Sequence, residues 1–99
     1  MNKKRQAEYE KRYAIDGRIC QRCGKPATQI AHRIANTKVN RKYWGKLIDN
    51  CVNLVPVCNL ECNASYNIGM KPIKCNRLQE LAEKDKNYTS KSITKYIED

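Results

Sequence analysis

The stretch that decides the fold is Cys20-Gln-Arg-Cys23, which recurs in a looser form as Cys58-Asn-Leu-Glu-Cys62. Each pair places two thiols within a few residues of each other, and zinc prefers four soft or borderline ligands arranged as a tetrahedron. We therefore expect Cys20, Cys23, Cys58 and Cys62 to hold one structural zinc ion. The only histidine of the chain, His32, lies between the two pairs and is left free for another role.

Six cysteines in 99 residues would also fit a secreted, disulfide-linked domain. The start of the chain argues against it, because the basic segment Met1–Arg5 is followed by the polar segment Gln6–Glu10 and not by the apolar part of a signal peptide. No run is long and apolar enough for a membrane span, so we expect a cytoplasmic protein with reduced thiols and no membrane partner. Cys51 and Cys75 are expected as small apolar fillers, with Cys51 kept open as an alternative zinc ligand.

The chain is short, highly charged and basic. Charged residues make up 30% of it, Phe is absent, and twenty Lys and Arg against ten Asp and Glu give a net charge of +10. So short a chain buries a modest core, whereas a structural zinc contributes roughly 10–16 kcal/mol of apparent binding free energy. The positive charge favours a polyanion, because each neutralised phosphate releases a counterion. We expect one domain over residues 1–99 that binds nucleic acid; the alternative is a basic domain without such a partner.

The residue pattern predicts helices at both ends and one in the middle. Residues 1–16 are rich in helix formers and form a basic N-terminal helix, and the apolar spacing within residues 76–98 predicts C-terminal helices. A further short helix is expected within residues 58–67, stopped by Gly69 and Pro72.

Two strands are expected between these helices. Residues 28–34 alternate in character, so that Ala31 and His32 lie on opposite faces of a strand. Residues 53–57 form a second, short strand, and the basic residues 36–50 are expected to be a long connection. The chain is therefore predicted to be a small α+β protein.

These motifs together resemble the HNH, or ββα-metal, nuclease family, in particular its zinc-stapled branch that includes phage endonuclease VII-like resolvases. The resemblance covers residues 18–70. Besides the first cysteine pair it is carried by Ile30-Ala31-His32-Arg33-Ile34, by Asn53-Leu54-Val55-Pro56-Val57-Cys58 and by Cys62-Asn63. It implies a ββα-metal finger, a hairpin of two strands followed by a helix, held by the four-cysteine zinc site. The implied function is hydrolysis of DNA phosphodiester bonds by a bacterial or phage-encoded endonuclease.

The resemblance also implies roles for single residues. His32 matches the general base that takes a proton from the attacking water, and an ordinary imidazole pKa of about 6.5 suits that task. Asn53 matches the residue that braces the loop and so helps to orient the histidine. Asn63 matches a ligand of one divalent ion, Mg²⁺ or Mn²⁺, which would neutralise charge on the scissile phosphate. Asparagine is also a common cap and turn residue, so a structural role for Asn53 and Asn63 stays open.

Ala31 departs from the family pattern, because the residue before the base is commonly Asp or His and supplies a second metal ligand. Three explanations stay open. Asp49 or Asn67 replaces the missing ligand; the ion is held by Asn63, phosphate oxygens and water alone; or the protein binds DNA without cleaving it. A basic zinc module that docks other proteins is a further alternative.

The residues expected to contact DNA are Arg33, Lys38, Arg41, Lys42 and Lys46. Arg33 adjoins the expected base and has the planar fork that binds phosphate in two places. Tyr43 and Trp44 either stack on bases or belong to the core, as a lone Trp in a small domain usually does. Such contacts are mostly to phosphate, so we expect salt-sensitive binding with little base recognition. The kind of DNA substrate and the formation of a homodimer are left open by the sequence.

Overall fold

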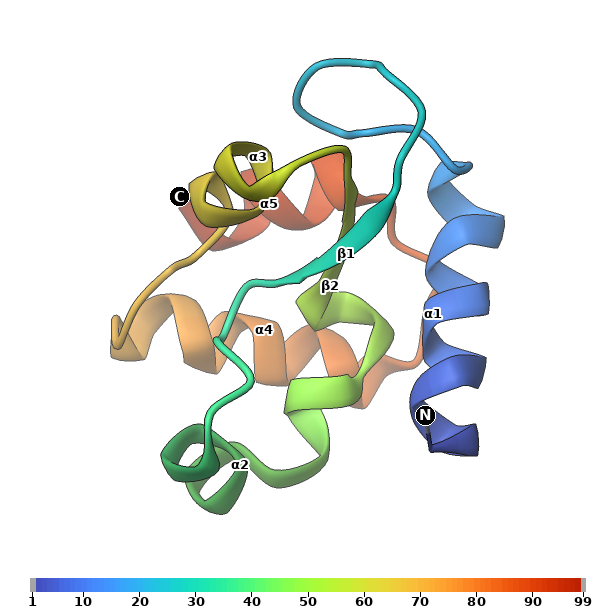
Figure 1. The fold of residues 1–99 in the computed structure, drawn as a ribbon. Helices are drawn as coiled ribbons and strands as arrows, with labels where there is room; N and C mark the ends of the chain where they lie inside the picture. Colours follow the sequence, from blue (N-terminus) through green and yellow to red (C-terminus); the bar gives the residue numbers. More distant parts are fainter. Residues whose placement is uncertain (1, 99) are drawn as a thin grey trace.

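The structure is a computed structural model that describes residues 2–98, drawn in Figure 1. Its elements, in chain order, are α1 (Lys3–Asp16), β1 (Gln29–His32), α2 (Lys38–Trp44), the 3-10 helices η1 (Gly45–Asp49) and η2 (Cys51–Asn53), β2 (Leu54–Val57), α3 (Leu60–Ser65), α4 (Pro72–Lys84) and α5 (Ser90–Glu98). The chain therefore forms a small α+β fold, as predicted. None of the helices in the described part is long and apolar enough to cross a membrane.

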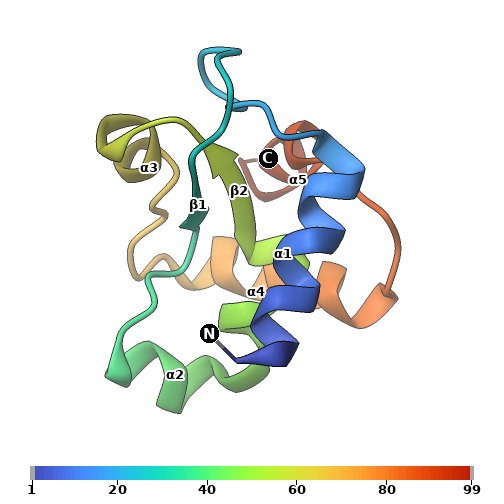
Figure 2. The same ribbon diagram turned by 45° about the vertical axis from the view of Figure 1, so that its right-hand side comes forward.

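The two strands form an antiparallel hairpin-like sheet. Ala31 pairs with Val55, and His32 pairs with Leu54. Because side chains alternate along a strand, Ala31 faces an apolar cluster that includes Val55 and Val57, whereas His32 belongs to the opposite face. Figure 2 shows the sheet between α3 on one side and α1 on the other. The two faces of β1 therefore meet different helices.

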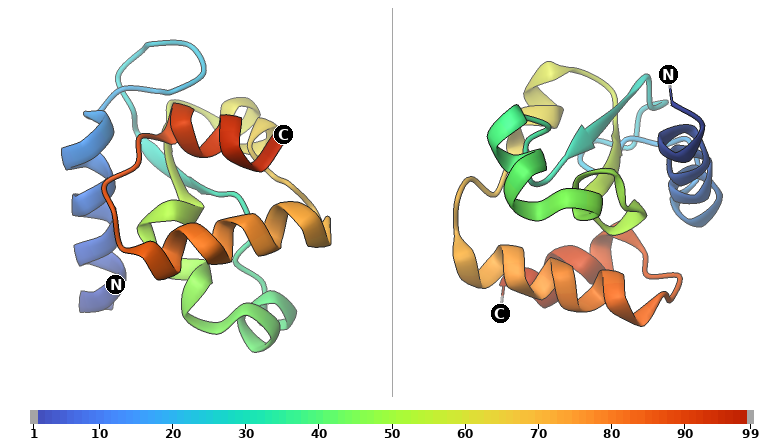
Figure 3. Two further views of the ribbon diagram at one scale, coloured as in Figure 1. Left: turned by 180° about the vertical axis from the view of Figure 1, so that it is seen from behind. Right: turned by 90° about the horizontal axis from the view of Figure 1, so that it is seen from below.

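Two apolar clusters divide the interior. The cluster under the sheet contains Cys20, Ala31, Val55, Val57 and Cys62. The larger, helical cluster contains Ile34, Leu47, Ile48, Val52, Ile68, Cys75, Leu78, Leu81, Ile93 and Ile97. Seen from behind in Figure 3, α4 and α5 lie side by side and cover this part of the molecule. The C-terminal helices thus close the larger core, and the cysteines belong to the smaller one.

The segment 36–50, expected as a connection, is mostly helical. Thr37 caps α2 through its hydroxyl, which accepts a hydrogen bond from the N–H of Asn40 at 3.1 Å. Gly45 ends the helix with a φ of +57°, a conformation that favours glycine. The expected connection was wrong, because Thr37 and Gly45 supply the start and stop signals of a helix within this basic segment.

Two further boundaries also differ from the expectation. Pro72, expected to stop the helix before it, instead lies in the first turn of α4, so the C-terminal helices begin before residue 76. Proline suits that place because its fixed φ is helical and the first N–H groups of a helix have no partner within it. β1 is also shorter than residues 28–34, since ladder pairing ends at His32.

A buried ion pair within α1 also bonds to the start of α5. Arg12 and Asp16 of α1 lie 3.1 Å apart, and both side chains are 1% exposed. Arg12 also donates to the carbonyl groups of Cys51 and Tyr88. Asp16 accepts from the N–H and the hydroxyl of Ser90, the first residue of α5. Residues 74 positions apart in the sequence are therefore held together by one buried carboxylate.

Candidate metal centre and histidine site

The four paired cysteines come together at one end of the sheet. The Sγ atoms of Cys20, Cys23, Cys58 and Cys62 all lie within 4.8 Å of one another. The sulfur–sulfur distance is 3.8 Å between Cys58 and Cys62 and 3.1 Å between Cys23 and Cys58. Zinc–sulfur bonds of about 2.3 Å place tetrahedral sulfurs about 3.8 Å apart. These four residues could therefore hold a metal ion such as zinc, as the sequence predicted.

Backbone hydrogen bonds shape the first cysteine pair. The N–H of Cys20 donates to the carbonyl of Lys25 at 2.7 Å, and the N–H of Gly24 donates to the carbonyl of Cys20 at 2.9 Å. Gly24 adopts a φ of +79°, which lets the turn close. The N–H of Gln21 donates to the carbonyl of Pro56 in β2, which ties the turn to the sheet.

The second pair is positioned by the start of α3. Cys58 directly follows β2, and Asn59 caps the helix by accepting from the N–H of Cys62 at 2.8 Å. One guanidinium nitrogen of Arg22 lies 3.7 Å from the sulfur of Cys62. This cation stands next to the sulfurs and would offset the negative charge of four thiolates around a divalent ion.

The thiols differ in their acidity. Burial raises the pKa of Cys20, but hydrogen bonds from the backbone at Cys23 and Arg22 outweigh it and lower the pKa to about 6. Burial raises the pKa of Cys51 and of Cys75, which lie outside the group of four. Both are buried thiols, as expected for apolar fillers, and Cys51 is not among the clustered sulfurs.

His32 ends β1 and faces α1. Its side chain is 12% exposed, and its Nε2 lies 3.7 Å from a carboxylate oxygen of Asp49. Nε2 is buried and has no hydrogen-bond partner in the described part of the chain. The ring of Tyr9 stands edge-on to the imidazole, with 6.3 Å between the ring centroids. Burial lowers the pKa of His32 and Asp49 opposes this, so the imidazole is neutral at neutral pH.

Asp49 is held by two arginines. Arg41 donates to both carboxylate oxygens at 3.0 Å, and Nε of Arg5 donates to one of them at 3.2 Å. Burial raises the pKa of Asp49, but the hydrogen bonds and charges of Arg41 and Arg5 outweigh burial and lower that pKa. The carboxylate is therefore charged at neutral pH. The side chains of Arg5 and Arg41 are 26% and 35% exposed, and both cations reach solvent beside the histidine.

Sequence reasoning did not find Arg5 and Tyr9 at this site. Both belong to α1, and only the packing of α1 against the end of β1 brings them near His32. The sequence carries no local signal for such a long-range approach. Asp49 was expected only as a metal ligand, whereas the structure pairs it with the imidazole and two guanidinium groups.

Asn53 is fully buried and joins two segments of the site. Its carbonyl oxygen accepts from the N–H of Ile34 at 2.7 Å. Its amide nitrogen donates to the carbonyl groups of Ile34 at 3.1 Å and Ile48 at 2.9 Å. The side chain therefore ties the chain that follows His32 to the chain that precedes Asp49.

Asn63 lies on the opposite side of β1 from the histidine. Its side-chain amide donates to the side-chain oxygen of Gln29 at 2.9 Å. Gln29 and Ala31 share one face of the strand, because they are two residues apart, and His32 faces the other way. The methyl group of Ala31 is fully buried on the Asn63 side. The structure thus does not bring Asn63 and His32 together on one face.

The residues around Asn63 match a catalytic divalent ion poorly. Mg²⁺ is usually held by one or two carboxylates together with substrate phosphates, whereas Asn63 and Gln29 offer only neutral carboxamides. Within residues 2–98 the four cysteines form the only group of three or more His, Cys, Asp or Glu side chains suited to a metal. Neither expected replacement for Ala31 is supported, because Asp49 is held by two arginines and Asn67 accepts from the N–H of Gly69 at 2.7 Å.

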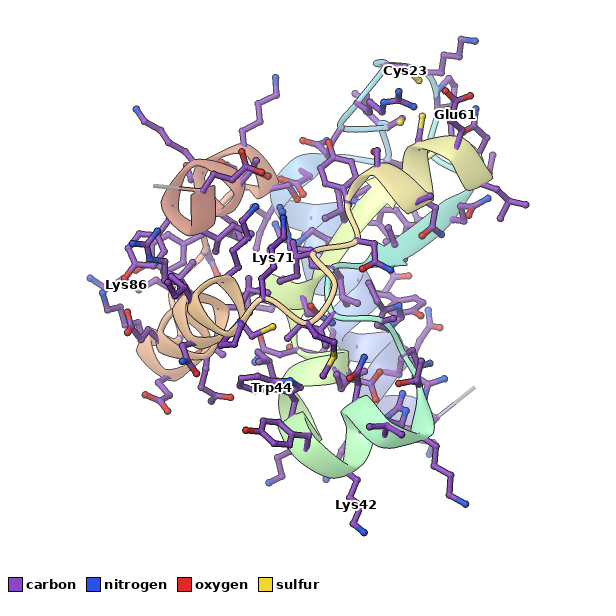
Figure 4. All side chains as sticks on the ribbon, turned by 90° about the vertical axis from the view of Figure 1, so that its left-hand side faces the viewer. Cys23, Lys42, Trp44, Glu61, Lys71 and Lys86 are labelled. Carbon is purple, nitrogen blue, oxygen red and sulfur yellow. The ribbon has the colours of Figure 1, made fainter. Side chains whose placement is uncertain are left out.

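The basic residues expected at DNA differ in their setting. Lys38, Lys42 and Lys46 are exposed on α2 and η1, and Figure 4 shows Lys42 pointing away from the body of the molecule. Arg41, on the same helix, turns inward to Asp49. Beside it, Tyr43 is 76% exposed, while Trp44, as the core alternative predicted, packs partly buried against the helical cluster.

Arg33 is not an exposed residue. It is 1% exposed, donates to the carbonyl of Ser90 at 3.0 Å, and places its guanidinium 5.5 Å from the ring centroid of Tyr66. The expected contact with a DNA backbone lying on the surface is therefore not supported, because the fork is covered by the segment after α3 and by α5.

No family model matches the chain, and no curated protein or solved structure is significantly similar to it. The resemblance to the HNH nucleases therefore stays a prediction from the motifs, and the chemistry of the site follows from its geometry.

Proposed function

We propose that this protein is an HNH-type DNA endonuclease, with a structural zinc ion on the four cysteines and His32 as general base. The observation that carries the proposal is the cluster at the end of β1, where a neutral imidazole lies 3.7 Å from the Asp49 carboxylate. Arg5 and Arg41 stand beside it with partly exposed guanidinium groups. A base, an orienting carboxylate and two phosphate-binding cations are the parts that phosphodiester hydrolysis needs.

Each residue has a distinct task in this mechanism. Asp49 faces Nε2 of His32 and would accept a hydrogen bond from an N–H at Nε2. The other ring nitrogen, Nδ1, is then unprotonated and serves as the base. The distance of 3.7 Å is longer than a hydrogen bond, and catalytic hydrogen bonds are often long without substrate and tighten in the complex. Nδ1 would then take the proton of a water molecule as its oxygen attacks the phosphorus. The P–O ester bond breaks, and the leaving oxygen takes up a proton from solvent. Arg5 and Arg41 stabilise the added negative charge.

The zinc ion has a structural part in the proposal. It would fasten the turn that carries Cys20 and Cys23 to the start of α3 and so hold β1 in place. Lys38, Lys42 and Lys46 would contact the DNA backbone. Since the residues around Asn63 suit a divalent ion poorly, no step of the mechanism depends on one.

The second candidate is a DNA-binding protein on the same scaffold that does not cleave. Two observations favour it. Ala31 is fully buried and cannot bind a metal ion, and Nε2 of His32 is shut off from solvent. Only the activity of the protein separates the two candidates.

The deciding experiment is nicking of supercoiled plasmid at low salt, with Mg²⁺, with Mn²⁺ and with a chelator. His32→Ala should lower the nicking rate by about a hundredfold or more, the usual contribution of a general base. Asp49→Asn should also lower it. Glu83→Gln, which removes one exposed carboxylate of α4, is the matched control and should leave the rate unchanged.

The outcomes separate the candidates cleanly. Equal nicking by the wild type and by His32→Ala would point to a contaminating nuclease and contradict the role of His32. A gel-mobility shift without nicking in any of the three conditions supports the non-cleaving protein. Failure to bind DNA even at low salt contradicts both candidates.

A further inference from the structure

A small cavity lies outside the histidine site, where the segment after α3, the start of α4 and the end of α5 meet. Its volume is about 220 Å³. The side chains lining it that matter here are Arg33, Tyr66, Asn67, Lys71, Lys74 and Glu98. Three of these are cations and one is a carboxylate, so the cavity is positively charged.

Arg33 brings a buried charge with an unused donor to this cavity. One terminal nitrogen donates to the carbonyl of Ser90, but Nε is buried and has no partner among the described residues. The backbone of Arg33 is held on both sides, since its N–H donates to the carbonyl of Asn53 and its carbonyl accepts from the N–H of Ile68. Burial lowers the pKa of Arg33 to about 10, so the guanidinium is still charged at neutral pH. A buried donor without an acceptor is costly, and a bound group in this cavity would supply the missing acceptor.

The start of α4 adds to the positive character. Lys71 occupies the N-cap position and Lys74 lies in the first turn, where there is neither an acidic residue nor a capping side chain. The N-terminal end of a helix carries partial positive charge and attracts anions. In Figure 4 the labelled Lys71 lies between α3 and the C-terminal helices. Glu98, 59% exposed and 3.7 Å from Lys74, makes only a loose ion pair that an anion can replace.

We propose that this cavity binds a terminal phosphate group, either inorganic phosphate or the phosphate monoester at the end of a nucleic-acid strand. Arg33, Lys71 and Lys74 would supply charged donors, and Nε of Arg33 would gain its missing acceptor. The volume is below the roughly 300–1,000 Å³ of pockets that enclose whole small molecules, so only the phosphate end enters. The site is separate from His32 and does not depend on nuclease activity.

The test is a titration of the full chain, zinc-loaded, followed by ¹⁵N NMR of its arginine side chains. Inorganic phosphate should bind saturably and shift the Nε–H signal of Arg33 more than that of any other arginine. Parallel titrations use an oligonucleotide with a 5′-phosphate and the same strand with a 5′-hydroxyl. Tighter binding of the 5′-phosphate strand than of the 5′-hydroxyl strand assigns the site to strand ends. Equal binding of the two strands, with saturable binding of inorganic phosphate, assigns it to free phosphate.

Two charge-matched variants make the result specific. The double change Lys71→Gln and Lys74→Gln should weaken phosphate binding by about tenfold or more, since charge-assisted hydrogen bonds are lost. Lys91→Gln with Lys95→Gln removes the same charge from exposed positions of α5 and should leave affinity within about twofold. Glu98→Gln should tighten binding. An absence of saturable binding, or equal weakening of phosphate binding in both lysine variants, overturns the proposal. Arg33 would then have only a structural role between α3 and α5.

Discussion

Asn53 shows how a single buried amide can fix the geometry of a site. Its three hydrogen bonds reach the backbone on either side of the His32–Asp49 contact. A carboxamide suits this place because it offers both an acceptor and donors, whereas a carboxylate or an aliphatic group would leave buried backbone groups unpaired. The orientation of the histidine therefore depends on a residue that does not touch it.

The single histidine makes its own titration directly measurable. Burial lowers the pKa of His32, with Asp49 opposing, so the folded protein prefers the neutral ring. The unfolded chain takes up a proton at about pH 6.5. Stability from this group is therefore complete above about pH 6.5 and falls as the pH drops from there towards the folded-state pKa.

NMR titration of the ring protons of His32 should give a pKa below 6.5. Denaturant unfolding at a series of pH values should show the decline in the wild type and its absence in His32→Gln. A measured pKa at or above 6.5 would mean that Asp49 outweighs burial. Only a pKa above about 7 would leave the ring mostly protonated at neutral pH and so deprive the mechanism of its neutral base.

Among single residues, the sequence predicted the clustering of the four cysteines and a bracing role for Asn53, because both predictions rest on short motifs. It did not identify the partners of His32. Arg5 and Tyr9 arrive from α1 through packing alone, and Arg33 looked like a surface cation although it is buried. The charge of an arginine does not show whether its side chain is exposed to solvent or buried among hydrogen-bond acceptors.

The turn that carries the first cysteine pair has little support other than a metal ion. It contains one isolated bridge, between Ile19 and Pro26, and a few backbone hydrogen bonds. Cys20 is the residue of this turn that packs in the apolar cluster of the sheet. Such a segment contains too few apolar contacts to stay ordered by itself, so we expect it to depend on the ion.

Removal of zinc should therefore unfold the cysteine end of the sheet. Elemental analysis should find one zinc ion per chain, and Cys20→Ser should abolish it and destabilise the fold, since zinc contributes roughly 10–16 kcal/mol of apparent binding free energy. Cys51→Ala is the matched control, because its thiol is buried outside the group of four. It should keep one equivalent of zinc. A well-folded protein without zinc, or zinc lost in Cys51→Ala, would contradict this assignment.

The elements themselves were largely predictable from the sequence. A high content of helix formers located α1, and apolar spacing located the C-terminal helices. Alternation over residues 28–34 located β1, and the short segment 53–57 was also predicted as a strand. The segment that forms α2 and η1 was missed although Thr37 and Gly45 mark both ends of α2. The interior of this segment is strongly basic and partly exposed, so its two cap residues are the only sequence signal for a helix. The helix forms because η1, which follows it, packs Leu47 and Ile48 into the core.

At the scale of the whole molecule, the Arg12–Asp16 pair joins α1, η2 and α5. Asp16→Asn should lower the free energy of unfolding by about 3–5 kcal/mol, because it leaves the buried Arg12 charge without its counter-ion. Glu10→Gln breaks the exposed pair with Arg18 and should cost less than about 1 kcal/mol. Urea unfolding of both variants gives the comparison. A loss in Asp16→Asn as small as that in Glu10→Gln would show that the buried pair is of little importance.

The same carboxylate limits how far the polypeptide can be trimmed. Residues 18–70 contain the cysteines, both strands and α3, and would be the natural choice of a minimal fragment. Yet cleavage after α1 would remove Asp16, and loss of the chain beyond residue 70 would remove Ser90, its partner. Limited proteolysis at either point should therefore yield unstructured peptides rather than a smaller working protein.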